Sequence, residues 1–168
     1  MELSFKDEDQ KSRKVMIQIR KAKDSDLSQL ELLFLRVRQK TFFWEPAESF
    51  KIEDYRKYTE NEKVYVAEDQ NKKLLGFIAV LEGDYPFIHH LYVSLESQKK
   101  GIGTLLIKHL FLHFPLPYRL KCLVSNVEAL HFYAKIGFLL VEQGIGESGE
   151  YALLELNSCS SLFNSRSV

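Results

Sequence analysis

The chain has 168 residues, of which 45% are hydrophobic, and this predicts a single domain with a substantial core. Its 23 lysines and arginines balance 23 aspartates and glutamates, so the charge gives no reason to expect a nucleic-acid partner. No stretch is apolar for long enough to span a bilayer, and no membrane partner is expected.

Both ends of the chain differ in composition from its middle. Residues 1–14 are mostly charged or polar and lack the apolar core of a signal peptide, and residues 158–168 are rich in serine. Cys122 lies in an apolar run, which is typical of a buried reduced thiol. We therefore expect a cytoplasmic protein with flexible segments at 1–14 and 158–168 around one domain at 15–157.

The first half of the domain alternates between strand and helix patterns. Asp24-Ser25-Asp26 offers N-cap chemistry, and apolar residues then recur every three or four positions. In chain order, the predicted elements are a strand at 15–19, a helix from Leu27 toward Val37, a short helix at 52–58, and strands at 64–67, 74–81 and 87–93.

The second half continues the alternation. The predicted elements are a helix from Ile102 that ends before Pro115, a strand at 120–124, a helix that ends at Gly137, and a hairpin of strands at 138–141 and 151–156. This order predicts a mixed sheet with helices on its faces, in the α/β or α+β class.

A glycine-containing connection joins the predicted strand at 87–93 to the next helix. Its residues 98–104 are Gln-Lys-Lys-Gly-Ile-Gly-Thr. Backbone N–H groups at a helix start, with glycines that allow close approach, suit a phosphate or pyrophosphate. Leu106 stands where the dinucleotide-binding fingerprint needs a glycine, and the P-loop ending is absent. An ordinary strand–helix turn is the alternative.

A second segment, residues 126–138, carries Asn-x-x-Ala-x-x-Phe-Tyr-x-x-x-Gly-Phe. Alone, it predicts only an amphipathic helix with a glycine stop. Together with Gln-x-x-Gly-x-Gly about two dozen residues earlier, it resembles the GNAT acyl-CoA N-acyltransferases. The resemblance covers roughly residues 17–156 and is strongest over 87–138.

The resemblance implies the GNAT fold: a central, mostly antiparallel mixed sheet of six to seven strands, about four flanking helices, and strands that splay at the acetyl-CoA site. It also implies an N-acetyltransferase that uses acetyl-CoA as co-substrate and no metal. The acceptor would be a primary amine of a small molecule or peptide, and the protein a monomer or homodimer. A coenzyme-A-binding sensor without turnover is the alternative function.

The resemblance assigns coenzyme A to two segments. Backbone amides of the 98–104 loop would hold the pyrophosphate, and the backbone of 91–93 would pair with the pantetheine arm. Asn126 would bond the pantetheine or position its strand, and Lys135 would approach a phosphate or remain a surface lysine. The expected cofactor-binding residues are Leu91, Tyr92, Val93, Gln98, Lys99, Lys100, Gly101, Ile102, Gly103, Thr104, Asn126, Tyr133 and Lys135.

Two residues are the predicted catalytic groups. Tyr133 would protonate the leaving thiolate, because an ordinary tyrosine stays protonated above the pKa of a thiol; a tyrosine that only packs is the alternative. His89 would be the general base, since it shares a strand face with Leu91 that looks into the acceptor cleft in the family. It could instead line that cleft, and Glu82 is the reserve base. His90 would lie on the opposite face, toward the helices or solvent.

The acceptor site is predicted from an aromatic cluster between the first two helices. The resemblance implies that this region borders the acceptor pocket, and aromatic walls suit an apolar or cationic amine. The expected substrate-binding residues are Phe42, Trp44, Glu82 and His89. The alternative is that the aromatic rings of this cluster only fill the core of the domain. His109 and His113 have metal-ligand spacing without a third ligand, so we expect no metal site there.

Overall fold

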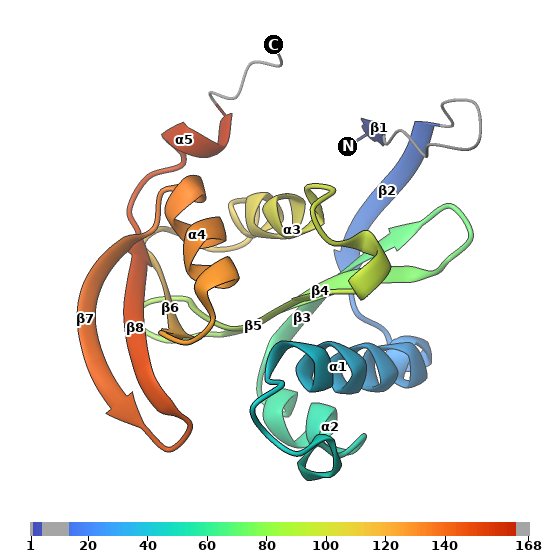
Figure 1. Ribbon diagram of the computed structural model, residues 1–168. Helices are drawn as coiled ribbons and strands as arrows, with labels where there is room; N and C mark the ends of the chain where they lie inside the picture. Colours follow the sequence, from blue (N-terminus) through green and yellow to red (C-terminus); the bar gives the residue numbers. More distant parts are fainter. Residues whose placement is uncertain (1, 5–13, 164–168) are drawn as a thin grey trace. The chain divides into compact units, whose positions relative to one another are not determined.

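The computed structural model describes residues 2–4 and 14–163 (Figure 1). The chain divides into two compact units, one formed by residues 1–79 and 90–107 and the other by residues 80–89 and 108–168. Each unit is described separately below. Within the described ranges, no helix has the length and apolar character needed to cross a membrane.

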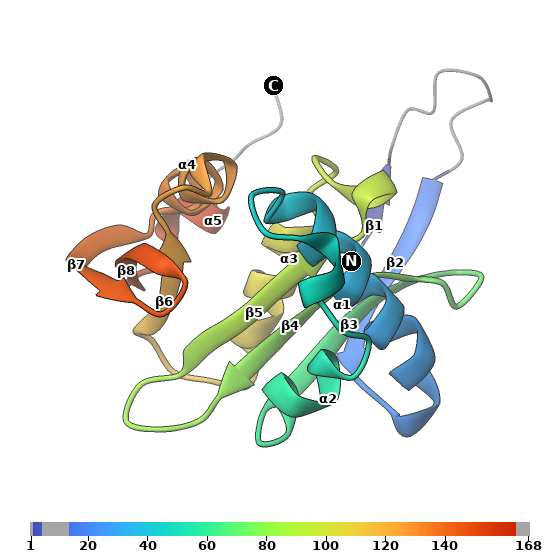
Figure 2. The same cartoon turned by 60° about the horizontal axis from the view of Figure 1, so that its bottom comes forward.

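The first unit is built on consecutive strands. Its elements are β1 (Glu2–Ser4), β2 (Lys14–Lys21), α1 (Leu27–Thr41), α2 (Asp54–Thr59), β3 (Lys63–Asp69), and the parts of β4 (Leu74–Leu81), β5 (Phe87–Val93) and α3 (Ile102–Leu110) that fall within its residues. The strand order is β1-β2-β3-β4-β5, and β2 pairs antiparallel with both β1 and β3. Helices α1 and α2 lie on one face of β3–β5 and α3 lies on the other (Figures 1 and 2).

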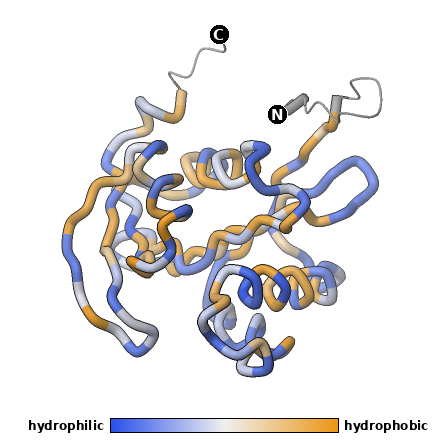
Figure 3. The backbone as a smooth tube through the Cα atoms, viewed as in Figure 1, coloured by the Kyte–Doolittle hydropathy of each residue, from blue (hydrophilic) through white to orange (hydrophobic). Residues whose placement is uncertain are grey.

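Helix coverage of both faces explains why β4 is almost entirely apolar. Its residues from Leu74 to Val80 are all buried, and the hydropathy tube is hydrophobic along this strand but hydrophilic in the turn before it (Figure 3). The apolar stripe of α1 packs into the same core. The buried members of this cluster are Leu30, Leu33, Phe34, Val37, Tyr55, Val64, Val66, Leu74, Phe77 and Ala79.

The second unit contains β6 (Tyr118–Leu123), α4 (Val127–Ile136), β7 (Leu139–Gly146), β8 (Gly149–Leu156) and α5 (Ser160–Phe163), besides the ends of β4, β5 and α3. Its strand order is β5-β6-β8-β7. The first residue of β5, Phe87, pairs in parallel with Arg119 of β6, whereas β6–β8 and β7–β8 are antiparallel.

The predicted fold class is confirmed: a mixed α/β fold with a mostly antiparallel sheet. Every predicted strand and helix is present, with bounds that differ by a few residues. Two short elements lie in segments expected to be flexible, namely β1 within 1–14 and α5 within 158–168. The other residues of the N-terminal segment up to 13, and residues 164–168, lie outside the described part. In that part the strands number eight rather than six or seven, because β1 adds a three-residue pairing with β2.

Candidate active site

The loop before α3 has the backbone shape of an anion cradle. Lys99 has φ 61° and Gly101 has φ 81°, so the chain turns through the left-handed region twice within three residues. The Leu105 N–H donates to Gly101 O at 3.0 Å, and the helix N–H groups before that bond have no intrahelical acceptor. Lys99 and Lys100 are both exposed. Donors, a helix dipole and two ammonium groups thus converge on one turn.

This loop is fixed to the two strands beneath it. The Gln98 side-chain amide donates to Val93 O at 3.1 Å, and the Ser94 N–H donates to Leu75 O at 2.8 Å. A Cβ atom at Gly76 on β4 would lie 2.8 Å from Tyr92 O, so only glycine lets the strands approach this closely. The backbone expected to meet pantetheine is therefore held against β4.

The second motif of the sequence forms α4, in the second unit. Asn126 caps the helix by accepting from the Ala129 N–H at 3.3 Å, and the predicted end at Gly137 is present with φ 112°. Tyr133 is only 9% exposed, with its ring 5.3 Å from that of Phe138. Packing therefore fixes the orientation of the tyrosine ring. Lys135 is exposed, as is Glu82 at the end of β4.

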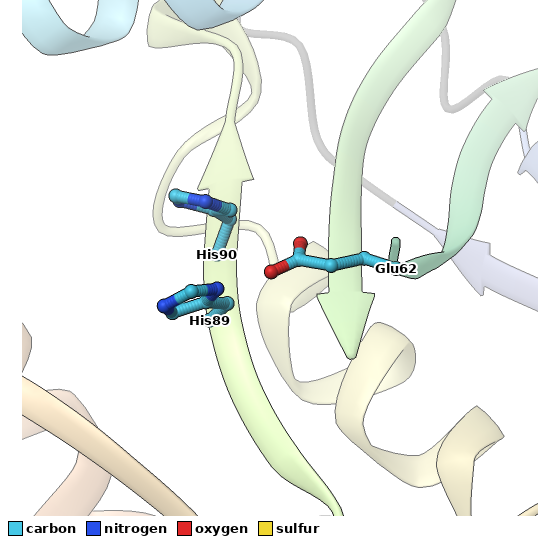
Figure 4. Close-up of side chains that lie close together, drawn as sticks. All are labelled: Glu62, His89 and His90. Atoms are coloured by element: carbon cyan, nitrogen blue, oxygen red, sulfur yellow. The ribbon is translucent and has the colours of Figure 1, made fainter. Parts of the chain in front are cut away.

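The two histidines of β5 have different surroundings. His89 is exposed and makes an edge contact with Phe87 at 5.6 Å. His90 is half-buried, and its ring lies 5.3 Å from that of Phe34 on α1. This matches the prediction that His90 lies on the helix side. The carboxylate of Glu62, from the residue before β3, lies beside both histidines: one of its oxygens and one ring nitrogen of each histidine all lie within 4.8 Å of one another (Figure 4).

Glu62 is a candidate that the sequence did not reveal. It stands alone in the polar turn 60–63, where it belongs to no motif and to no periodic pattern. Its proximity to His90 depends on the pairing of distant strands, which residue spacing does not show.

The aromatic residues between α1 and α2 form a cluster of their own. The Phe42 ring is half-buried and lies 6.2 Å from that of Phe50 in a stacked arrangement. Trp44 is 40% exposed and Phe43 is 80% exposed, and their rings touch edge to face at 5.2 Å. The first ring thus belongs partly to the core, whereas the last two face solvent and are available to a ligand.

Comparisons with known proteins match these features. A family model described as the acetyltransferase (GNAT) domain matches residues 60–139, the stretch that holds β3 to α4 and both motifs. Over this stretch the chain matches the GNAT acetyltransferase domain. The matched stretch includes the loop before α3 and the capped helix α4.

Two curated relatives of the chain are N-acetyltransferases. It is 31% identical over 85 residues to the peptidyl-lysine N-acetyltransferase YiaC of Escherichia coli, and 33% identical over 117 residues to the spermidine N(1)-acetyltransferase of Vibrio cholerae. These matches cover 51% and 61% of this chain, but only 56% and 65% of the relatives, less than two thirds of each.

The solved structure supports the GNAT fold. The PaiA N-acetyltransferase of Thermoplasma acidophilum, in complex with coenzyme A, superposes with a TM-score of 0.70. The comparison covers 85% of this chain and 99% of that one, at 22% identity.

Outside the GNAT motifs, His109 and His113 face each other in the second unit. Their Nε2 atoms are 3.1 Å apart, and burial, together with the neighbouring His113, lowers the pKa of His109. Among the residues that the structure describes, no third histidine, cysteine or carboxylate completes a metal site with this pair. The prediction that the protein needs no metal stays a prediction.

Proposed function

We propose that the protein is an N-acetyltransferase that moves an acetyl group from acetyl-CoA to a primary amine. The observation that carries this proposal is the loop at 98–104, with two left-handed residues directly before the first turn of α3. Such a turn presents N–H donors and a positive helix end to a pyrophosphate. The GNAT family match supports coenzyme A as the source of that pyrophosphate.

The adjoining strand supplies the second part of the cofactor site. Coenzyme A would leave the loop along β5, where the backbone of Leu91–Val93 offers hydrogen-bonding groups to the pantetheine amides. Asn126, Tyr133 and Lys135 would contribute from α4. Because Asn126 already caps α4, its side-chain oxygen would be shared between the helix and any pantetheine contact.

The reaction would proceed by direct attack in a ternary complex. A neutral amine adds to the thioester carbon, and a backbone N–H can stabilise the resulting oxyanion. Collapse forms the amide and breaks the C–S bond, and the thiolate takes a proton. Tyr133 would donate that proton from its hydroxyl, because phenols ordinarily titrate above thiols.

The acceptor that the site favours is a cationic amine. Trp44 and Phe43 present exposed rings that can hold an ammonium by cation–π contact, and Glu45 and Glu48 add negative charge beside them. The relatives named above act on peptidyl-lysine and on spermidine, both of which carry such amines. A polyamine or a lysine side chain is therefore the substrate class to test first.

Calorimetric titration with acetyl-CoA tests the cofactor site. We expect one-site binding by the wild type and a loss of at least about tenfold in affinity for Gly101→Glu, because the new side chain places charge and bulk in the cradle. Gly83→Glu is the matched control. A Cβ there meets only Tyr85 O, at 3.9 Å, so this variant should bind as the wild type does.

Failure of the folded wild type to bind acetyl-CoA would remove the basis of the proposal. Binding without thiol release, when spermidine and a blocked lysine peptide are both supplied, would favour the coenzyme-A-binding sensor instead.

A further inference from the structure

His90 sits inside a shell of aromatic rings in the first unit. Its imidazole lies 5.3 Å from the Phe34 ring at 87°, 6.0 Å from Tyr92 in a stacked arrangement, and 6.4 Å from Tyr58. These rings come from α1, β5 and α2, so three elements fix the imidazole. A polar ring held so firmly among aromatic neighbours calls for a chemical explanation, because apolar residues would fill the same volume at less cost.

Glu62 supplies the charge that this imidazole faces. One of its oxygens lies within 4.8 Å of a ring nitrogen of His90 (Figure 4). Both the Nε2 atom of His90 and the Oε2 atom of Glu62 are removed from solvent. A carboxylate near a histidine stabilises the imidazolium form through its negative charge.

Other charged or titratable groups also lie around His90. Arg38 stacks 4.7 Å from the Phe34 ring and 5.5 Å from the Tyr58 ring, and it donates to Asp54 at 2.8 Å. On α2, burial raises the pKa of Tyr55 to about 12, so its phenol is neutral. The remaining titratable groups near His90 are the phenols of Tyr58 and Tyr92 and the exposed His89. Glu62 is therefore the carboxylate that lies beside the imidazole.

The position of His90 along β5 relates it to the proposed reaction. Leu91–Val93, the stretch expected to bind pantetheine, follows His90 directly, and the phosphate loop lies beyond it. With a rise of about 3.3 Å per residue, His90 lies just past the pantetheine stretch, on the side away from the phosphates. A thioester at the end of that arm would come to this part of the strand.

We propose that His90, on the α1 side of β5, is the general base of the acetyl transfer in place of His89, and that Glu62 is its positioning residue. This inference rests on the proposed acetyltransferase function. The imidazole of His90 takes one proton from the acceptor's ammonium, directly or through a water. The freed lone pair then forms the C–N bond, and the ionised Glu62 stabilises the imidazolium by its charge. After the C–S bond breaks, the thiolate is protonated and the second amine proton leaves to solvent.

Rates measured against pH test the role of His90, with spermidine and a blocked lysine peptide as acceptors. His90→Gln should lower kcat/KM about 100-fold at neutral pH and abolish the acid limb of the profile. His113 is an exposed histidine outside the site, so His113→Gln should keep the wild-type kcat/KM and the acid limb of the profile. If His89→Gln removes the acid limb and His90→Gln does not, the assignment to His90 is wrong.

A second variant separates positioning from a structural role. Glu62→Gln should shift the acid limb by about one unit toward lower pH, because loss of the carboxylate disfavours the imidazolium. Glu60→Gln, an exposed carboxylate two residues earlier, should leave the limb in place. A merely structural Glu62 would change stability without moving the limb.

A third measurement does not depend on turnover. The His90 ring proton, followed by NMR against pH, should titrate at lower pH in Glu62→Gln than in the wild type. An unchanged midpoint would overturn the pairing of His90 with Glu62. A shifted midpoint in a protein that binds acetyl-CoA but acetylates neither amine would keep the pairing and reject the acetyltransferase function.

Discussion

A single phenol carries the acid step of the proposed reaction. Tyr133 is almost fully buried, and its ring contacts those of Phe132 and Phe138 at 5.2 and 5.3 Å. Contacts of this kind depend on the ring and not on the hydroxyl, so the hydroxyl can be removed without disturbing the packing.

Tyr133→Phe should therefore lower kcat by about 10- to 100-fold while leaving affinity for acetyl-CoA and thermal stability near wild type. Steady-state kinetics and calorimetry on the same preparation provide the measurement. Unchanged kcat would show that the tyrosine only packs, and Phe132→Leu serves as the control for loss of an aromatic contact.

At the scale of elements, α4 illustrates how a motif residue can stabilise a helix as well as serve a site. Asn126 accepts from the Ala129 N–H, which satisfies one of the free donors of the first turn. Asn126→Ala should cost about 1 kcal/mol in the free energy of unfolding, measured by urea denaturation. Asn126→Asp keeps an accepting oxygen, so its free energy of unfolding should be close to that of the wild type. Equal stability of all three proteins would show that the cap contributes nothing.

The sequence predicted most elements because their patterns are local. The continuous apolar run of β4, the apolar residues at every third or fourth position of α1, and the Gly137 stop of α4 are visible in single segments. β1 was missed because Glu2–Ser4 joins the sheet through backbone pairing with β2, which leaves no apolar pattern. α5 was missed because four residues, two of them serines, carry no helical period.

The candidate site was predicted only in part, for a related reason. Its two motifs lie in continuous stretches, so the loop at 98–104 and the helix with Tyr133 could be found from spacing. The shell around His90 combines Phe34, Tyr58 and Glu62 from three separate elements. Such long-range contacts arise from tertiary packing and have no signature in residue order.

The whole molecule contains a buried ionic network that links β2, the turn before α1, and β3. Arg20 donates to both Asp26 oxygens, at 2.7 and 2.9 Å, and to Glu68 at 2.6 Å. Glu68 is 1% exposed, and it also accepts from Lys72 at 3.0 Å. The hydrogen bonds from Arg20 lower the pKa of each carboxyl group below its usual value.

Arg20→Met should destabilise the protein by about 3–5 kcal/mol at pH 7, because it leaves two buried carboxylates without their main partner. The matched control is Arg56→Met. Arg56 is paired with Glu31 at 2.7 Å, but its side chain is 65% exposed, and its loss should cost less than about 1 kcal/mol. Similar costs for the two variants would contradict a structural role for the network.

The same network predicts how stability depends on pH. Carboxyl groups with lowered pKa values contribute stability that is complete above their unfolded pKa values near about 4 and is lost as the pH falls through the folded values. The difference between wild type and Arg20→Met should thus shrink as the pH falls below about 4. Denaturation curves at several pH values would show this, and a constant difference would exclude the linkage.

The close approach of β4 to β5 has a consequence for how variants of this protein would be distributed in a genetic screen. A side chain at Gly76 would displace the Tyr92–Val93 backbone. Selection for loss of the proposed acetyl-CoA binding would therefore recover substitutions at Gly76 as well as substitutions in the loop at 98–104. A list of residues that contact the proposed cofactor would omit Gly76, although the proposed binding depends on this glycine.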